Sequence, residues 1–369
     1  FHTGIFNELA VYKKAKQAKG YGMIDLSIGS PDLPPAKPIM DILSRHAQNP
    51  NLYGYTLSGT EAFHHAVAFY YKTRFGVKLD EKTEILQLMG SQDGLVHLPM
   101  AFADPEDVIL VPDPGYTAYQ AGIAMAGAKA YPMPLKKESN FLPNISSIPD
   151  DIAERAKMMI LNFPGNPVPA LADQTFFEEV VRFANRYGIL VVHDFAYSEL
   201  VFNGIRPFSF LQVEGAKEVG VEFNSLSKSF NMAGCRIGYL VGHPAVVETL
   251  GRLKSNLDYG VFAPIQGAAV FALENGEAFA DANRKVYEQR IEVLIDGFRQ
   301  LGWSVDRPKA TMFIWAEIPR GWKSEAFTYA LMDQAGIVVT PGNAFGEYGE
   351  GFVRIALVQS EERLREAVK

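Results

Sequence analysis

Short apolar runs alternate with helix-length segments through the middle of this chain of 369 residues. The helix-length segments include residues 116–125 and 173–187. Such alternation is typical of βαβ units, so we expect an α/β fold with a mostly parallel sheet covered by helices on both faces. Catalytic and binding side chains are then expected at strand ends. The apolar runs, which we predict to be buried strands, are 108–111, 128–132, 158–161, 190–193, 219–225 and 237–241.

The last quarter of the chain has a different pattern. Residues 277–301 carry apolar side chains at helical spacing and predict one long helix. Two alternating runs, 313–318 and 352–358, predict strands, and residues 324–335 predict another helix. We therefore expect an α+β segment after the α/β segment.

Composition excludes several function classes. The chain is 48% hydrophobic and 21% charged with a formal net charge of −7, which gives no reason to expect nucleic acid or an anionic membrane as a partner. The single cysteine, Cys235, excludes an internal disulfide and suits a cytoplasmic protein. No apolar run reaches transmembrane length, no signal peptide is visible, and the histidines lack zinc-type spacing. No Gly-x-Gly-x-x-Gly follows a strand, which argues against a dehydrogenase.

The stretch SLSKSFNMAGCRIGY, residues 225–239, is the most informative for function. Lys228 follows a predicted strand, where partial desolvation would lower its pKa and free the amine for Schiff-base chemistry. Ser225, Ser227 and Arg236 supply hydroxyl groups and a positive charge suited to a phosphate. A solvated lysine in a serine-rich turn is the plainer interpretation of this motif when it stands alone.

Other polar residues also stand at the ends of predicted strands. Asp194 follows the apolar run ILVVH, where a carboxylate is costly unless it is paired, although an N-cap is an alternative. Ser91 follows the strand predicted at 85–89 and is expected to be the N-cap of a helix whose first N–H groups suit a phosphate. Arg354 is the one basic residue of the apolar run FVRIALV, so it needs an anion, either a substrate carboxylate or a structural partner.

Eight motifs in order make the chain similar to the class I and II aminotransferases, pyridoxal-phosphate (PLP) enzymes of fold type I. The resemblance implies a seven-stranded sheet in a large domain at 43–277, a small α+β domain at 1–42 and 278–369, and a homodimer with shared active sites. One departure is Pro167-Val168-Pro169 after Asn166, where the family usually continues Pro-Thr-Gly. The motifs are SIGSPDLPP (27–35), YGYTLSGT (53–60), GSQDG (90–94), PDPGY (112–116), NFPGNP (162–167), HDFAYSEL (193–200), SLSK (225–228) and FVRIALV (352–358).

The resemblance also implies a role for each site residue. Lys228 would hold PLP as an aldimine and move the substrate proton, Asp194 would keep the ring nitrogen protonated, and Tyr197 would bond the ring oxygen with Asn166. Tyr116 would cover the ring, with Tyr119 as the alternative. The phosphate ligands would be Gly90, Ser91, Gln92, Ser225, Ser227 and Arg236, joined by Tyr55, or else Tyr53, from the partner subunit; Gly29, Asn166 and Arg354 would bind the substrate α-carboxylate.

The substrate is suggested by the segment at 256–262, NLDYGVF, which contains no arginine for a distal carboxylate. The sequence of this segment resembles that of LL-diaminopimelate aminotransferases and alanine aminotransferases, so we expect a neutral or zwitterionic amino donor and 2-oxoglutarate as acceptor. A broad-specificity aminotransferase and a PLP-dependent lyase acting on carbon–sulfur bonds are the enzymatic alternatives. An effector-binding regulatory module is the non-enzymatic one, although no basic helix-turn-helix segment is visible.

Overall fold

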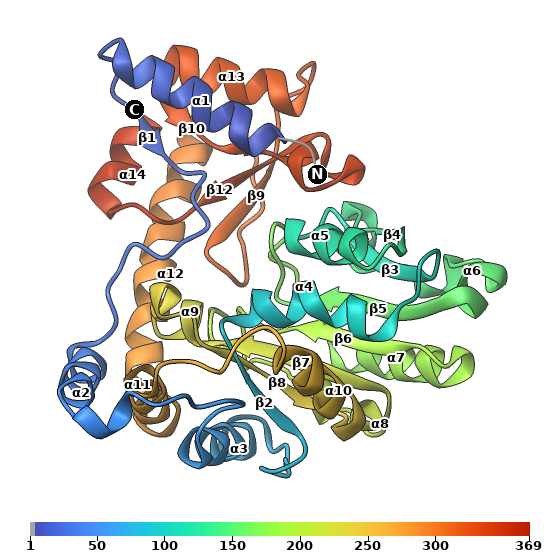
Figure 1. Ribbon diagram of the computed structural model, residues 1–369. Coiled ribbons are helices and arrows are strands. Elements are labelled where there is room, and N and C mark those ends of the chain that lie inside the picture. The colour runs from blue at the N-terminus through green and yellow to red at the C-terminus, as the bar shows by residue number, and fades with distance from the viewer. Residues whose placement is uncertain (1–3) are drawn as a thin grey trace.

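A seven-stranded sheet forms the centre of the larger part of the molecule (Figure 1). The computed structural model describes residues 4–369, and the strand order is β2-β8-β7-β6-β5-β3-β4. Neighbouring strands run parallel except at β8, which is antiparallel to β2 and to β7. The predicted α/β fold with a mostly parallel sheet is therefore confirmed. The strands are β2 (Ile85–Leu88), β3 (Val108–Asp113), β4 (Lys129–Pro134), β5 (Ala156–Asn162), β6 (Leu190–Asp194), β7 (Gly220–Ser225) and β8 (Gly238–Gly242).

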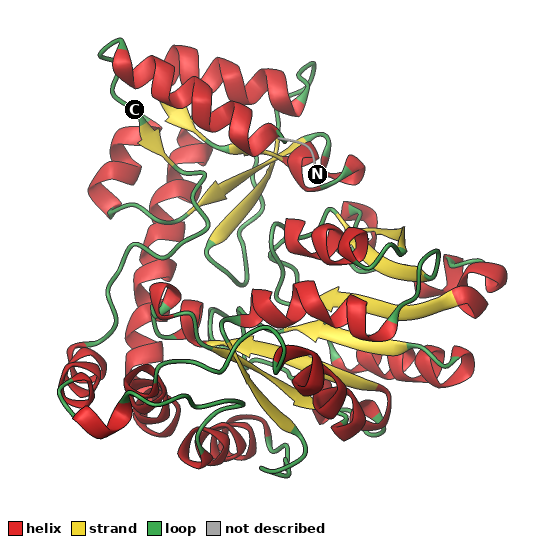
Figure 2. Ribbon diagram, viewed as in Figure 1, coloured by secondary structure: helices red, strands yellow, loops and turns green. Residues whose placement is uncertain are grey.

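Helices cover both faces of this sheet (Figure 2). Successive side chains of a strand point to opposite faces, so Met158 and Ile160 of β5 join one core, and Met159 and Leu161 join the other. The first core is closed by α4 (Ser91–Phe102), α5 (Thr117–Met125) and α10 (Pro244–Lys254). The second is closed mainly by α3 (Glu61–Phe75), α7 (Gln174–Tyr187) and α11 (Ala263–Asn275), and the shorter helices are α2 (Lys37–Ala47), α6 (Asp150–Arg155), α8 (Ala216–Val219) and α9 (Leu226–Ser229).

A smaller part carries a three-stranded antiparallel sheet in the order β11-β12-β9. Its core contains Phe313 and Ile355 from two of these strands and Leu294 from the long helix α12. A separate parallel pair joins β1 near the N-terminus to β10. The elements of this part are α1 (Ile5–Ala18), β1 (Ile24–Asp25), α12 (Glu277–Gln300), β9 (Phe313–Glu317), α13 (Ser324–Ala335), β10 (Ile337–Val338), β11 (Thr340–Pro341), β12 (Phe352–Ala356) and α14 (Glu361–Val368).

Helix α12 runs alongside both parts, from α11 to the smaller sheet (Figure 1). Its Arg290 donates to both carboxylate oxygens of Asp32 at 2.7 and 2.9 Å and to Leu357 O at 2.8 Å, so it ties the segment before α2 to the smaller part. The predicted domain limit at residue 43 falls inside α2, and the limit at 277 falls at the start of α12. The division into 43–277 and the two flanking segments stays a prediction.

Most predicted elements occur within one or two residues of their expected limits. The strand expected at 158–161 is longer, Ala156–Asn162, and the strand expected at 352–358 is shorter, ending at Ala356. Within residues 4–369, no helix combines the length and apolar character that a membrane span requires. The same residues contain no cluster of three or more potential metal-ligating side chains.

Candidate active site

A cavity of about 580 Å³ lies between the seven-stranded sheet and the smaller sheet. Two of the predicted site residues are not among those that line it: Gly90 lies behind Arg236, and Tyr55 is on an exposed loop. The other predicted site residues line this one cavity, although they come from segments that are far apart in the sequence. The predicted residues that line the cavity are Gly29, Ser91, Gln92, Tyr116, Asn166, Asp194, Tyr197, Ser225, Ser227, Lys228, Arg236 and Arg354.

Lys228 lies in the short helix α9, which directly follows β7. Burial, together with the positive charges of Arg354 and Arg236, lowers the pKa of its amine to about 8. Its Nζ donates a hydrogen bond to the carbonyl oxygen of Gly29 and lies 5.9 Å from the centre of the Tyr197 ring. An amine in this environment is available as a nucleophile near neutral pH.

Asp194 is the last residue of β6 and is 4% exposed. Burial raises the pKa of its carboxyl, while hydrogen bonds from Tyr119 and from the Ala196 N–H act in the opposite direction. Tyr119 OH donates to Oδ2 at 2.6 Å, and Ala196 N donates to Oδ1 at 3.1 Å. Because no helix follows at this point, the N-cap alternative for Asp194 does not apply. A buried carboxylate facing a cavity favours a cation beside it.

The hydroxyl of Tyr119 is bonded to Asp194, a contact that the sequence does not predict. The family resemblance implies Tyr119 only as the alternative to Tyr116 for covering a ring. Tyr116 and Tyr119 meet edge to face at 5.7 Å, and Tyr116 OH donates to Gln92 Oε1 at 2.6 Å. Tyr116 is the N-cap residue directly before α5 and Tyr119 lies in its first turn, and no local pattern predicts the bond of Tyr119 to Asp194.

The other end of the cavity carries a helix N-terminus and an arginine. Helix α4 begins at Ser91, and Gly90 is its N-cap, with no side-chain capping bond, so the expected N-cap role of Ser91 is wrong. Gly90 has φ 83°, and a Cβ there would lie 2.5 Å from Nη2 of Arg236. Glycine is therefore required both by the backbone conformation and by the close approach of the guanidinium. Within the part of the chain that the structure describes, no acceptor is bonded to the first N–H groups of α4, which suits them to a ligand.

Arg236 adds positive charge to this helix end. It adopts φ 51° and donates from Nη1 to Ala233 O at 2.8 Å. Among residues 4–369 it forms no ion pair, so its charge is not neutralised within the chain. Ser225 caps α9 by accepting from Ser227 N at 3.0 Å. An anion with several oxygen acceptors, such as a phosphate, complements this group of donors.

Arg354 lies in the middle of β12 and is 4% exposed. Its Nη1 donates to Asn166 Oδ1 at 2.9 Å, its Nη2 donates to Ser27 O at 2.7 Å, and its Nε has no partner among residues 4–369. The rings of Phe313 and Phe345 lie 4.2 and 4.8 Å from the guanidinium carbon. Burial lowers the pKa of Arg354 to about 10.

The structural ion pair considered for Arg354 is not present among the described residues. A buried guanidinium that has only neutral partners and borders a cavity is suited to a carboxylate that enters that cavity. The two flanking phenylalanines are further residues that sequence reasoning missed, since Phe313 and Phe345 carry no motif of their own. Tyr197 lies against one of them, 5.9 Å from Phe313, and burial raises the pKa of its hydroxyl well above the usual range.

The site residues fit PLP in the chemistry of their side chains. Arg236 and the start of α4 suit the phosphate, and the buried carboxyl of Asp194 suits a protonated ring nitrogen. Lys228 suits the aldehyde, and Arg354, with Nε unpaired, suits the carboxylate of an amino acid. Arg236, Asp194 and Arg354 would thus each face an opposite charge on the cofactor or on the substrate, and Lys228 would face the aldehyde.

Two segments with predicted roles lie together outside this cavity. Tyr55 is 83% exposed, and its ring lies 5.0 Å from that of Tyr259. Thr56 N and Leu57 N both donate to Tyr259 O. Tyr53 packs on Phe262 at 5.0 Å, and its hydroxyl donates to Ala47 O. We call the four rings Tyr53, Tyr55, Tyr259 and Phe262 the aromatic platform.

The segment 256–262, expected to bind the substrate side chain, does not line the cavity of its own chain. Asn256 donates to Arg252 O, and Asp258 accepts from Lys254, whose buried amine also donates to Asp93. The polar groups of this segment are thus bonded to neighbouring parts of their own chain rather than to the cavity.

Comparisons with known proteins agree on one family. Residues 21–369 match the family model described as "Aminotransferase class I and II". The chain is 45% identical to an LL-diaminopimelate aminotransferase of Moorella thermoacetica over 97% of this chain and 93% of that protein. It is similar to substrate-bound BacF of Bacillus subtilis, with TM-score 0.93, 38% identity, and coverage of 97% and 92% of the two chains. It is also similar to a probable N-succinyldiaminopimelate aminotransferase of Thermus thermophilus, with TM-score 0.93, 36% identity and 98% coverage of each chain.

Proposed function

The chain belongs to the class I and II aminotransferases, which are PLP-dependent enzymes, and on that premise we propose that it transfers the amino group of LL-diaminopimelate to 2-oxoglutarate. The observation that best supports an amino-acid substrate is the environment of Arg354. Among the described residues this buried cation has only neutral partners, and it lines the same cavity as Lys228 and Asp194. The choice of donor is supported by the 45% identity to an LL-diaminopimelate aminotransferase over nearly the whole chain.

The cofactor, when bound, supplies an aldehyde for the amine and an electron-withdrawing ring. Lys228 would provide the amine that holds the cofactor, and once the substrate amine has taken its place the released Nζ would carry the substrate proton. Asp194, whose position is fixed by Tyr119, would hold a proton on the ring nitrogen. Arg354 orients the substrate by its α-carboxylate, and Asn166 is held against Arg354 by the hydrogen bond between them.

Few charged side chains line the cavity for the far end of the substrate. The cations that line the cavity are Lys228, Arg236 and Arg354, and each already has a proposed partner. The amide nitrogen of Gln92, whose Oε1 already accepts from Tyr116 OH, is a neutral donor available for a zwitterionic end or for the second carboxylate of 2-oxoglutarate. An acidic amino donor such as aspartate is less well matched than a zwitterionic one, because no further cation lines this cavity for its distal carboxylate.

The test of the substrate is kcat/KM for LL-diaminopimelate, alanine and aspartate with 2-oxoglutarate. We expect LL-diaminopimelate to be preferred and the amount of keto acid formed to equal the amount of glutamate. A preference for aspartate of about tenfold, which corresponds to roughly 1.4 kcal/mol of transition-state stabilisation, would reject the proposed donor. Release of pyruvate and ammonia without amino transfer would indicate elimination instead.

The proposal includes a homodimer in which the aromatic platform serves the neighbouring active site. The platform is exposed and lies outside the cavity of its own chain, and Tyr55 has no hydroxyl partner among residues 4–369. Because the hydroxyl of Tyr53 is bonded to Ala47 O, Tyr55 is the better candidate for a phosphate of the partner.

Mixed dimers test this arrangement directly. Lys228→Ala and Tyr55→Ala should each have low activity alone, because each damages both sites of its own homodimer. After unfolding and refolding together, they should regain activity, since one site of the mixed dimer then contains both native residues. Sedimentation reports the dimer, and a fully active monomer or a mixture without recovery would contradict the shared site.

A further inference from the structure

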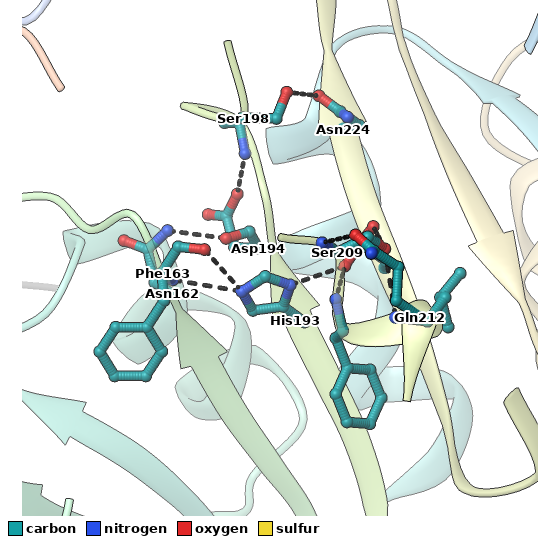
Figure 3. A network of polar contacts seen from close by, with 12 residues as sticks. Asn162, Phe163, His193, Asp194, Ser198, Ser209, Gln212 and Asn224 are labelled. Carbon is teal, nitrogen blue, oxygen red and sulfur yellow. Dashed lines mark hydrogen bonds and ion pairs between the residues drawn. The ribbon is translucent and has the colours of Figure 1, made fainter. Parts of the chain in front are cut away.

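Directly behind Asp194, a fully buried histidine contacts the loop that carries Asn166. His193 is the residue before Asp194 on β6 and points to the opposite face of the sheet, where its side chain is 0% exposed. Its Nδ1 lies 2.8 Å from Oε2 of Glu222, and its Nε2 lies 3.0 Å from Phe163 O and 3.2 Å from Phe163 N. Figure 3 shows the ring between Phe163 and the group around Ser209.

Glu222 is the partner that fixes this ring. It stands opposite His193 in the parallel register of β6 and β7, and it is also fully buried. Besides His193, its carboxylate accepts from Tyr71 OH at 2.6 Å, Ser209 Oγ at 2.7 Å and Phe210 N at 2.9 Å. Four donors around one carboxylate leave it well satisfied, so the acid acts as a rigid anchor inside the core.

The loop after β5 carries this anchoring to the cavity. Asn162, next to Phe163, donates from Nδ2 to Asp194 O at 2.9 Å and accepts from Asn166 N at 2.9 Å. Asn166 in turn accepts from Arg354 at 2.9 Å. A Cβ at Gly165 would lie 2.4 Å from Val168 O, so the loop is tightly wound and has little freedom to adjust. A series of polar contacts, joined by the peptide bond between Asn162 and Phe163, thus runs from Glu222 to Arg354.

We propose that the His193–Glu222 pair is a positioning device that fixes the conformation of the loop 162–166. Through this loop, the pair sets how far Asn166 and Arg354 lie from Asp194. The pair touches neither substrate nor cofactor. Its effect passes through the backbone of Phe163, to which the imidazole is bonded. The inference rests on the proposed roles of Asn166, Asp194 and Arg354.

The polar pair is costly to bury at this position. Apolar side chains would fill this volume without the desolvation penalty of a buried acid and imidazole, and phenylalanines already surround the ring, with Phe177 at 5.1 Å and Phe195 at 5.3 Å. A directional contact to a backbone fixes a loop in a way that apolar packing does not. Misplacement of a reacting group by about 1 Å costs up to 10²-fold in rate, so a loop shift should be visible in binding and turnover.

The experiment replaces the imidazole and keeps its packing. In His193→Phe, the aromatic contacts remain and both polar contacts are lost. We expect KM for the amino donor and the apparent Kd for PLP to rise by about tenfold, and the visible circular dichroism of the bound cofactor to change, because Asn166 and Asp194 no longer hold their relative positions. Thermal unfolding is measured in parallel.

Ser209→Ala is the matched control. It removes a 2.7 Å bond to the same carboxylate but does not touch Phe163, so it should lower thermal stability and leave KM, cofactor Kd and circular dichroism unchanged. His193→Gln keeps an amide that can contact both Glu222 and Phe163, and it should restore part of the native values. If His193→Phe does not fold, the comparison of His193→Gln with Ser209→Ala tests the inference. Only His193→Gln should then change KM, cofactor Kd and circular dichroism.

Two outcomes overturn the inference. One is native KM, Kd and circular dichroism in folded His193→Phe, whatever its stability, or in His193→Gln where His193→Phe does not fold. The other is the same change in His193 and Ser209 variants, which would show a general loss of stability. Failure of the proposed function is distinguishable, because it would appear in the native protein, as absence of bound PLP at Lys228 or of amino transfer.

Discussion

His193 and Asp194 are neighbours on one strand, but their side chains have different surroundings. His193 faces the core and is paired with Glu222, whose remaining acceptor positions are filled by three other donors. Asp194 faces the cavity with a phenol and one backbone N–H, and burial raises the pKa of its carboxyl. The difference indicates which charges serve the fold and which await a ligand.

Two arginines show the same contrast. Arg290 and Arg354 are each 4% exposed. Arg290 is bonded to both oxygens of Asp32, whereas Arg354 has an amide, a carbonyl and two aromatic rings as neighbours. A buried charge without a counter-charge costs folding free energy, so its retention next to a cavity indicates a function.

The largest effect is expected for Asp194→Asn. Turnover should fall by about three orders of magnitude, because the ring nitrogen loses the charge that keeps it protonated. Much of the cofactor should stay bound. The cofactor-free variant should be at least as stable as the native protein at neutral pH, since a carboxyl whose folded pKa is raised weakens folding above its unfolded pKa.

The measurements for this variant are single-turnover rates and denaturant unfolding. Near-normal turnover would remove Asp194 from the proposed site. A marked loss of stability in the cofactor-free protein would instead place Asp194 with the structural charges such as Glu222, and the contrast drawn above would fail.

A smaller effect is expected for Arg354→Met, with Arg290→Met as its counterpart. Arg354→Met should raise KM for the amino donor by about 10- to 100-fold, as one charge-assisted bond of about 1.5–3 kcal/mol is lost, with little loss of stability. Arg290→Met should lower stability by about 1–3 kcal/mol, because Asp32 loses its partner, and should leave KM nearly unchanged. Steady-state kinetics and unfolding curves distinguish the two variants. A marked loss of stability in Arg354→Met together with a raised KM in Arg290→Met would contradict the comparison.

Much of the fold was predictable from the sequence because its strands are continuous apolar runs. The run preceding Asp194 and the run preceding Lys228 both became strands, β6 and β7, that end at the cavity. Reversal of β8 was not predictable, since a buried antiparallel strand has the same composition as a parallel one. The expected capping by Ser91 failed because the close approach of Arg236 requires the preceding glycine at the N-cap.

The site was predictable to the extent that motifs stand at strand ends. Partners supplied by distant or unremarkable residues were not. Tyr119 on Asp194 and Phe345 beside Arg354 depend on how helices and loops pack, which no local pattern encodes. Similarly, Tyr55 and the segment 256–262 carried separate predicted roles, and only the structure shows them joined through Tyr259.

Tyr119→Phe should reduce turnover by about tenfold, since it removes one hydrogen bond to a charged group worth roughly 1.5 kcal/mol. Without this donor the pKa of the Asp194 carboxyl rises further, and the proton on the ring nitrogen is held less firmly. Tyr187→Phe is the control, because Tyr187 makes an equally short bond of 2.6 Å to Asp150 on the surface. Equal kinetics for the two variants would show that Tyr119 contributes packing only.

The smallest effect concerns Lys228 in the cofactor-free protein. Its folded pKa of about 8 lies below the ordinary value of 10.5, so below pH 8 folding bears the full cost of burying a charged amine. Between these two values the unfolded chain binds more protons than the folded one, and stability should rise with pH. Lys228→Met should therefore be more stable than the native protein at pH 7, and this difference should narrow toward pH 10. Because every other group titrates in both proteins, the difference between their unfolding free energies isolates Lys228. A difference that stays constant from pH 7 to pH 10 would show that Lys228 is solvated and belongs with the surface lysines.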